Sequence, residues 1–173
     1  MEEIELTYLA KNLPGGLVKF PSKEMLDIYL PSTSAHPGLR IRKRGDVVEI
    51  TKKRPVVSGD ASHQTEHTIT LTEDEYRELS AVQGKRVAKT RYYYKEGGTD
   101  FEIDIFRGAL EGLVLVDVEF SSLEKKNSFP MPSFCLADVT QESFIAGGMI
   151  CGKSYADIEN DLSRFGYHKL FLS

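Results

Sequence analysis

Short runs in which apolar and polar residues alternate recur along the chain, and this pattern limits its fold more than any other feature of the sequence. A period of two is typical of β-strands, because successive side chains of a strand point to opposite faces of the sheet. Turn residues separate the runs, and Gly45-Asp46 and Glu96-Gly97-Gly98 are typical of tight hairpins. The pattern predicts eight strands, at Glu3–Leu9, Leu26–Leu30, Leu39–Arg44, Val47–Arg54, His63–Leu71, Lys85–Tyr94, Asp100–Phe106 and Leu113–Phe120. Eight is a common strand number for a small barrel, so we expect a mainly β protein of the α+β class, built on a closed eight-stranded antiparallel β-barrel.

Helices are predicted between and after the strands. Thr72 and Glu75 have the spacing of a capping box, ahead of an apolar helical face. Further helices are expected at Ser122–Asn127, Thr140–Met149 and Tyr155–Phe165, with Gly166 as a stop signal and a polar loop at Val56–Ser62. We therefore expect one domain over residues 1–173, with flanking helices, a barrel at about 1–120 and a helical C-terminal region at about 121–173.

The segment from Gly147 to Ser154 matches the bare spacing of a phosphate-binding loop, Gly-x-x-x-x-Gly-Lys-Ser. Such a loop requires a preceding strand and a parallel βαβ unit, and the residues before Gly147 favour helix instead. We therefore expect Gly152 and Ser154 to have a turn or helix-capping role.

Charge and composition exclude several classes of protein. The net charge of -4 argues against nonspecific nucleic-acid binding, which normally requires a basic surface. The sequence has no secretory signal and no apolar run long enough to span a membrane, so we expect a cytoplasmic protein without a membrane partner. Cys135 and Cys151 have no metal or redox spacing, and we expect reduced, buried thiols.

The charged residues of the predicted strands are sorted by sign. Acidic residues share one face of the first, seventh and eighth strands: Glu3 and Glu5, Glu102 and Asp104, and Asp117 and Glu119. The third strand carries Arg40, Arg42 and Arg44 on one face. For any single strand, an ordinary amphipathic sheet with its charges in water would explain the pattern. Solvated surfaces usually mix signs, however, and like charges on adjacent positions repel. Acid-only and base-only strands together favour an interior that binds an anion and cations, such as a polyphosphate with Mg²⁺ or Mn²⁺.

Three other strands add charges less regularly. The fourth strand has Lys52 and Arg54 on one face, together with Val48 and Ile50, whereas Glu49 and Lys53 lie opposite. The sixth strand has Lys89 and Arg91 on one face, and the fifth carries Glu66.

These motifs resemble those of the CYTH superfamily, the triphosphate tunnel metalloenzymes, from Glu3 to about Thr140. The matching pieces, in order, are Glu3-Ile4-Glu5-Leu6-Thr7, Arg40-Ile41-Arg42, Lys52, Lys89-Thr90-Arg91-Tyr92, Glu102 to Gly108, and Val116 to Phe120. The resemblance implies an eight-stranded tunnel that binds triphosphate-containing molecules with Mg²⁺ or Mn²⁺.

By the same resemblance, Glu3, Glu5 and Glu119 would bind the metal, with Glu66, Glu102, Asp104 and Asp117 as supporting acids. Arg40, Arg42, Lys52, Arg54 and Arg91 would hold phosphate oxygens. Lys89 matches a lysine that activates the attacking water, and neighbouring cations would lower its pKa for that role. The alternative is that Lys89 is one more phosphate contact.

The chain departs from the family pattern at Thr7, where a lysine is expected, and at Thr68, where a second acid is common. We expect a metal-dependent triphosphatase acting on a small triphosphate-containing substrate. A class IV-type adenylate cyclase and a non-catalytic triphosphate-, polyphosphate- or nucleotide-binding protein are the alternatives. A homodimer is one option for the oligomeric state.

Overall fold

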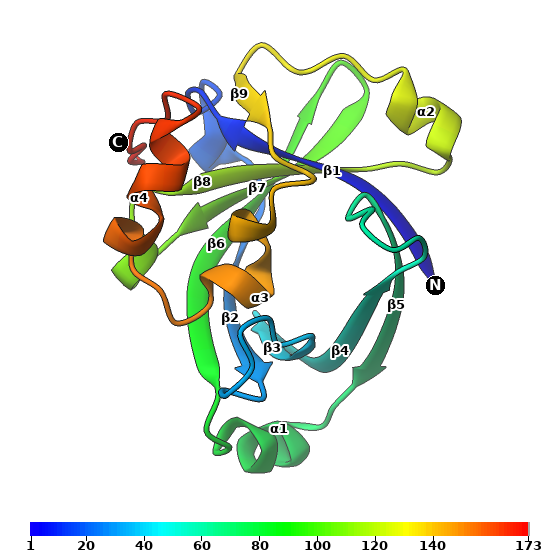
Figure 1. Ribbon diagram of the computed structural model, residues 1–173, viewed down its shortest axis with the longest axis vertical. Helices are drawn as coiled ribbons and strands as arrows, with labels where there is room; N and C mark the ends of the chain where they lie inside the picture. The colour runs from blue at the N-terminus through cyan, green and yellow to red at the C-terminus, as the bar shows by residue number, and fades with distance from the viewer. Residues whose placement is uncertain (173) are drawn as a thin grey trace.

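Eight antiparallel strands close into a barrel in the computed structural model, which describes residues 1–172 (Figure 1). The strands are β1 (Glu2–Ala10), β2 (Ser22–Leu30), β3 (Leu39–Arg44), β4 (Val47–Pro55), β5 (His63–Thr70), β6 (Lys85–Glu96), β7 (Thr99–Phe106) and β8 (Val114–Glu119). Their order around the barrel is β5-β4-β3-β2-β6-β7-β8-β1, and β1 pairs with β5 to close it. The predicted barrel is confirmed, and so are both glycine hairpins, in which Gly45, Gly97 and Gly98 have positive φ.

A ninth strand, β9 (Cys135–Asp138), continues along the edge of β1 beyond the start of β5. The sequence did not predict it, because four residues are too few to show an alternating pattern. The C-terminal region is therefore not purely helical.

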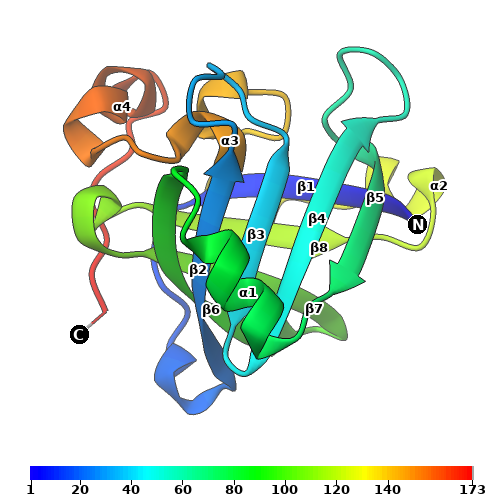
Figure 2. The same cartoon turned by 90° about the horizontal axis from the view of Figure 1, so that it is seen from below.

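The capping box is confirmed: Thr72 caps α1 (Glu73–Ser80) together with Glu75. Helix α1 lies against the outer face of β3 and β4 (Figure 2). Helices α2 (Leu123–Asn127) and α4 (Tyr155–Ser163) also form, and Ser154 is the N-cap of α4. Gly152 and Gly166 have positive φ, as their turn and stop roles require.

The helix predicted at Thr140–Met149 is wrong. Two short turns replace it, the 3-10 helix η3 (Ser143–Ile145) and α3 (Gly147–Ile150), separated by the extended backbone of Ala146. Two consecutive glycines weaken a helix, and a Cβ at Gly147 would overlap the hydroxyl of Tyr29. Two further 3-10 turns are η1 (Leu17–Lys19) and η2 (Gly108–Leu110).

Two apolar clusters hold the barrel. The first lies outside its wall, where Tyr8, Ile103 and Val116 pack against Leu17 and Phe134 of the flanking segments. The second lies at one end of the barrel, where Leu9, Tyr29, Val87 and Leu115 meet side chains of η3, α3 and α4. Figure 1 shows η3 and α3 lying across part of this end. The apolar faces of β1, β7 and β8 therefore point outward, which leaves their polar faces to line the interior. Cys135 and Cys151 are buried and unpaired.

A candidate triphosphate and metal site inside the barrel

Strand register places most of the predicted site residues on the inner face of the barrel. Residues opposite each other in antiparallel strands share a face. The register pairs Arg42 with Asp27, Arg91 with Asp104, Glu102 with Asp117, and Glu5 with Glu119. The inner set contains Glu3, Glu5, Arg40, Arg42, Glu66, Lys89, Arg91, Glu102, Asp104, Asp117 and Glu119. The sorted charges therefore do line one enclosed space.

Lys52 and Arg54 do not face this space, so their predicted position was wrong. Lys52 lies opposite His67 and Leu39 on the outer face, and Arg54 shares that face and is exposed. Lys53 points inward instead and contacts carboxylates of β1 and β5. The signal was available in the sequence, because Val48 and Ile50 share the face of Lys52, and apolar faces point outward in the neighbouring part of the barrel.

The acidic side of the interior surrounds the ammonium of Lys53. Lys53 Nζ contacts Glu3, lies 3.6 Å from Oε1 of Glu5 and lies 3.4 Å from Oε2 of Glu66. Burial raises the pKa of Glu5 to about 7, with Asp117 and Glu3 adding to the effect and Lys53 opposing it. Burial and Glu3 likewise raise the pKa of Glu119. These carboxylates are crowded beyond what one lysine neutralises, so another cation would stabilise their charged forms.

A divalent ion fits this donor set by its chemistry, since Mg²⁺ and Mn²⁺ prefer carboxylate oxygens. Within residues 1–172 no three acidic, histidine or cysteine side chains are already gathered as a metal cluster. The ammonium of Lys53 instead contacts Glu3, Glu5 and Glu66.

A second ion-pair network is centred on Asp104, which is 1% exposed. Its carboxylate accepts hydrogen bonds from Arg91 at 2.6 Å and contacts Lys89. Arg91 also contacts Glu102 and lies 3.1 Å from Asp117. Burial alone would raise the pKa of Asp104, but Arg91 and Lys89 hold it far below its ordinary value. The network fixes two cations next to each other at the centre of the interior.

The side chain of Lys89 is 11% exposed, and burial is the main cause that lowers its pKa. Asp104 opposes this effect, whereas Arg91 and Arg42 add to it. A lysine with a lowered pKa is a better proton acceptor at neutral pH than a free one.

Arg42 is held by Asp27, a residue that the sequence did not single out. The guanidinium donates to both carboxylate oxygens, at 2.6 and 2.7 Å. Asp27 is 2% exposed, and although burial raises its pKa, Arg42 lowers it to about 2. A single acid between apolar neighbours on β2 gave no sorted pattern, so its partner became evident only from the register of β2 and β3.

The basic side retains unused donors. Nε of Arg40 and Nε of Arg44 are buried and have no hydrogen-bond partner among residues 1–172. Buried donors without partners are costly. An anion such as phosphate would satisfy them, and arginine suits its geometry.

The two threonines that depart from the family pattern both make hydrogen bonds. Thr7 Oγ1 donates to Asp117 at 2.8 Å, and Thr68 Oγ1 donates to Glu66 at 2.8 Å. Thr68 also lies 3.0 Å from the hydroxyl of Thr51. Each hydroxyl therefore orients a carboxylate of the interior.

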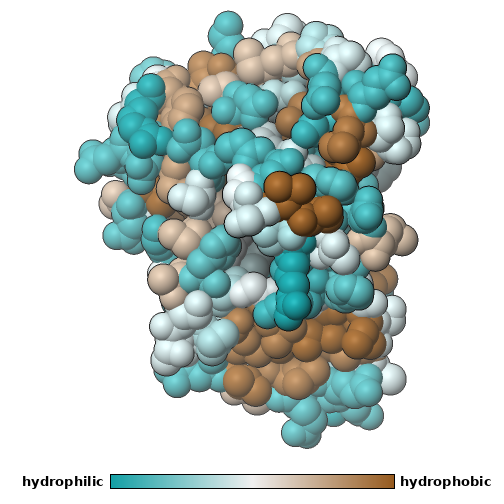
Figure 3. All heavy atoms as spheres, turned by 45° about the vertical axis from the view of Figure 1, so that its right-hand side comes forward, coloured by the Kyte–Doolittle hydropathy of each residue, from teal (hydrophilic) through white to brown (hydrophobic). Residues whose placement is uncertain are grey.

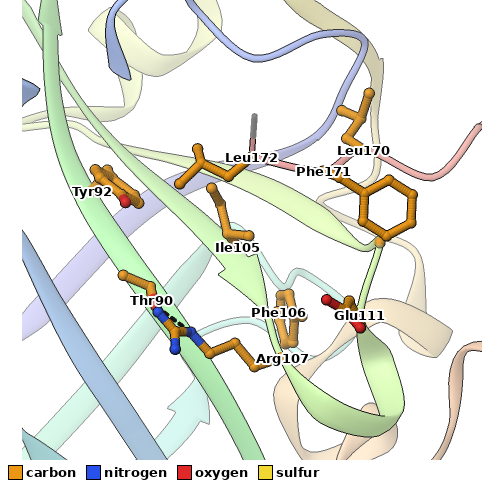
Figure 4. Close-up of a pocket in the computed structure, with 10 residues that line it drawn as sticks. Thr90, Tyr92, Ile105, Phe106, Arg107, Glu111, Leu170, Phe171 and Leu172 are labelled. Carbon is orange, nitrogen blue, oxygen red and sulfur yellow. Dashed lines mark hydrogen bonds between the residues drawn. The ribbon is translucent and has the colours of Figure 1, made fainter. Parts of the chain in front are cut away.

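Two cavities adjoin the barrel. The larger, about 720 Å³, lies between the β6–β7 hairpin and the segment around α2, and Glu102 and Glu119 line it. It therefore reaches the acidic residues of the interior. The smaller, about 310 Å³, lies outside the wall, against Thr90, Tyr92, Ile105 and the C-terminal Leu170–Leu172 (Figure 4). Arg107 donates to Thr90 there, away from the charged interior.

Comparison with known proteins supports the same family. No family model matches the chain. An inorganic triphosphatase from Nitrosomonas europaea is 33% identical over 144 residues, which cover 82% of this chain and 91% of that protein. The crystal structure of an inorganic triphosphatase superimposes with a TM-score of 0.63 at 28% identity, covering 87% of this chain and 95% of the other.

A Hippeastrum protein named as an adenylyl cyclase with a dominant triphosphatase activity shares the fold, with a TM-score of 0.50 at 13% identity, covering 99% of this chain and 91% of that one. Among the residues that the structure describes, no helix is long and apolar enough to cross a membrane. The inward sorted charges and the similarity over nine-tenths of a triphosphatase lead to one conclusion: the chain belongs to the CYTH superfamily of triphosphate tunnel metalloenzymes.

Proposed function

We propose that this chain hydrolyses inorganic triphosphate, or a closely related triphosphate-containing molecule, inside the barrel. The observation that carries the proposal is the division of the interior into an acidic side, with Glu3 and Glu5, and a basic side, with Arg40 and Arg42. A triphosphate with a bound cation is complementary to both sides at once. The triphosphatase relative supports the reaction class.

The metal site of the proposal consists of Glu3, Glu5 and Glu119, with Mg²⁺ or Mn²⁺ as the ion. The raised pKa values of Glu5 and Glu119 support this assignment, because burial and neighbouring acids disfavour the charged carboxylates, which a bound cation would stabilise. Glu66, Glu102, Asp104 and Asp117 act as supporting acids that hold lysines and arginines in position. A bound ion supplies positive charge against phosphate oxygens and lowers the pKa of coordinated water.

Phosphate oxygens bind to Arg40, Arg42 and Arg91 in this proposal, and Lys53 takes the phosphate-binding role that was predicted for Lys52. Asp27 and Asp104 keep Arg42 and Arg91 extended before substrate arrives, so little reorganisation is needed on binding. Phosphoryl transfer depends mainly on such positioning and charge neutralisation.

Lys89 takes the proton of the attacking water. Its enclosed position and lowered pKa support this role, and Arg91 and Arg42 keep the neutral form accessible. If Lys89 only contacts phosphate, Lys89→Ala will raise KM while the pH dependence of kcat stays unchanged. If it accepts the proton, the rise of kcat with pH through the pKa of Lys89 will be lost.

The remaining expectations belong to the same proposal. The chain acts as one domain, is cytoplasmic, and has a small triphosphate-containing molecule as its partner, without nucleic acid or membrane. A homodimer is part of the proposal.

The deciding experiment incubates the protein with Mg²⁺ or Mn²⁺ and, separately, with tripolyphosphate, ATP and thiamine triphosphate. We expect phosphate release from tripolyphosphate that EDTA abolishes and that Glu3→Gln reduces strongly. Lys52→Ala is the matched control, since Lys52 lies on the outer face. Cyclic nucleotide and pyrophosphate from ATP would instead indicate a cyclase. Thermal stabilisation without turnover would indicate a binding protein.

A further inference from the structure

Part of strand β5 is not covered by the strand that closes the barrel. The register of β1 with β5 runs only from Glu2 opposite Thr65 to Ile4 opposite His63, and the backbones of Met1 and Glu66 add the last bonds. Residues 67–70 continue past this point and are all exposed. On the side away from β4, nothing among residues 1–172 pairs with them.

The free backbone groups can be assigned from the alternation of an antiparallel ladder. The N–H of Leu71 donates to Val48 and the N–H of Val56 donates to His63, so the odd-numbered residues of β5 face β4. The N–H and C=O groups of Thr68 and Thr70 therefore point to the open side. Such an edge is a template for another strand, and natural proteins normally cover or disrupt it.

The same segment carries one apolar side chain on the outer face, Ile69, beside His67. Ile69 is 66% exposed and lies opposite Ile50 of β4. Figure 3 shows an extended apolar area on the lower half of the face that it draws. An exposed isoleucine next to unpaired strand groups marks a docking surface better than either feature alone.

The charges on either side of Ile69 indicate which partner fits this edge. On one side of Ile69 the outer face carries Lys52 beside His67, and no ion pair involves Lys52 among residues 1–172. On the other side, α1 begins with Glu73, Asp74 and Glu75. Lys43 contacts Glu73 and Arg77 contacts Asp74 in exposed ion pairs, and Glu75 caps α1 with Thr72, so this side carries more acidic than basic groups. An antiparallel second copy reverses this order, so the basic side of one copy meets the acidic side of the other.

We propose that a second copy of this chain docks on this edge, with strand β5 pairing antiparallel to β5 of the partner across a twofold axis at Ile69. Thr68 then lies opposite Thr70 of the partner subunit, and the two threonines of each copy use all of their free backbone groups. The two Ile69 side chains meet on the outer face as a cross-strand pair. The pairing ends where Met1 covers Glu66 and where α1 begins.

Sedimentation equilibrium over micromolar to millimolar concentrations of the full chain tests the proposal. We expect a reversible dimer whose Kd rises at least about tenfold in Ile69→Lys, because a charge replaces the central apolar contact. Thr70→Pro should weaken the dimer similarly, since it removes a donor that faces solvent in the monomer. Val57→Lys is the matched control, because Val57 is also an exposed apolar residue but lies outside the edge.

Three further measurements test whether the dimer forms through this edge. Thermal unfolding should show that Ile69→Lys remains folded, and the amides of Thr68 and Thr70 should gain hydrogen-exchange protection as concentration rises. Lys52→Glu should weaken the dimer, and adding Asp74→Lys should restore it. A monomer at all concentrations, or a dimer that Ile69→Lys and Val57→Lys affect equally, would overturn the proposal.

Discussion

Arg42 and Asp27 show how single residues hold the charged interior in place. Both are almost fully buried and are joined by two hydrogen bonds. Replacing Asp27 by asparagine leaves the guanidinium without a counter-ion in a protein interior. We expect Asp27→Asn to reduce the free energy of unfolding by about 3 to 5 kcal/mol at neutral pH, measured by urea denaturation.

The pH dependence of stability provides a second test of the ion pair between Asp27 and Arg42. Arg42 lowers the pKa of Asp27 from its ordinary value of 3.8 to about 2. A lowered folded-state pKa contributes stability that is fully present above about pH 4 and is lost as pH falls toward about pH 2. We expect the variant to lose less stability than the wild type across this window. If the free energy of unfolding fell equally in both proteins across this window, the ion pair would be contradicted.

Lys53 and Lys52 are adjacent, chemically identical and on opposite faces of β4. We expect Lys53→Met to lower kcat/KM for tripolyphosphate by about 10- to 100-fold, since a hydrogen bond to a charged group contributes about 1.5 to 3 kcal/mol. Lys52→Met should stay close to the wild-type rate. Circular dichroism confirms that each variant is folded, and equal losses in both would show that the face assignment is wrong.

At the scale of elements, alternation along the chain was enough to predict all eight barrel strands, because turn glycines and a period of two are local signals. The inner face was predicted wherever one strand carried charges of one sign. It failed on β4, where cations occupy both faces, and at Asp27, whose partner lies on another strand. Which faces meet inside is a property of register, and register depends on residues far apart in the sequence.

Gly147, the first residue of α3, lies where the structure leaves no room for a side chain. A Cβ at Gly147 would overlap the hydroxyl of the buried Tyr29. We expect Gly147→Ala to reduce the free energy of unfolding by about 1 to 3 kcal/mol through overpacking. Tyr29→Phe removes the overlapping oxygen, so the double variant should recover much of that loss in a double-mutant cycle. Additive losses would place the strain elsewhere.

At the scale of the whole molecule, the chain carries a net charge of -4, whereas the acids and bases of its interior are paired with each other. Lys53 is held by Glu3 and Glu5, and Arg91 is held by Asp104 and Asp117. A triphosphate that enters alone brings negative charge beside Glu3, Glu5 and Glu119. A metal ion that enters alone meets the basic side. Each ligand therefore removes the electrostatic cost of binding the other.

This argument predicts positive coupling between metal and triphosphate. By linkage the coupling is reciprocal, and a typical value of about 1 to 3 kcal/mol would make each ligand bind about 5- to 150-fold more tightly when the other is present. Thermal unfolding with tripolyphosphate alone, Mn²⁺ alone and both together measures it. The combined shift in Tm should exceed the sum of the separate shifts. Glu5→Gln is the control that should lose this excess, because it removes a carboxylate from the acidic side. Additive shifts in the wild-type protein would mean that the two ligands bind independently and that the acidic and basic sides do not form one site.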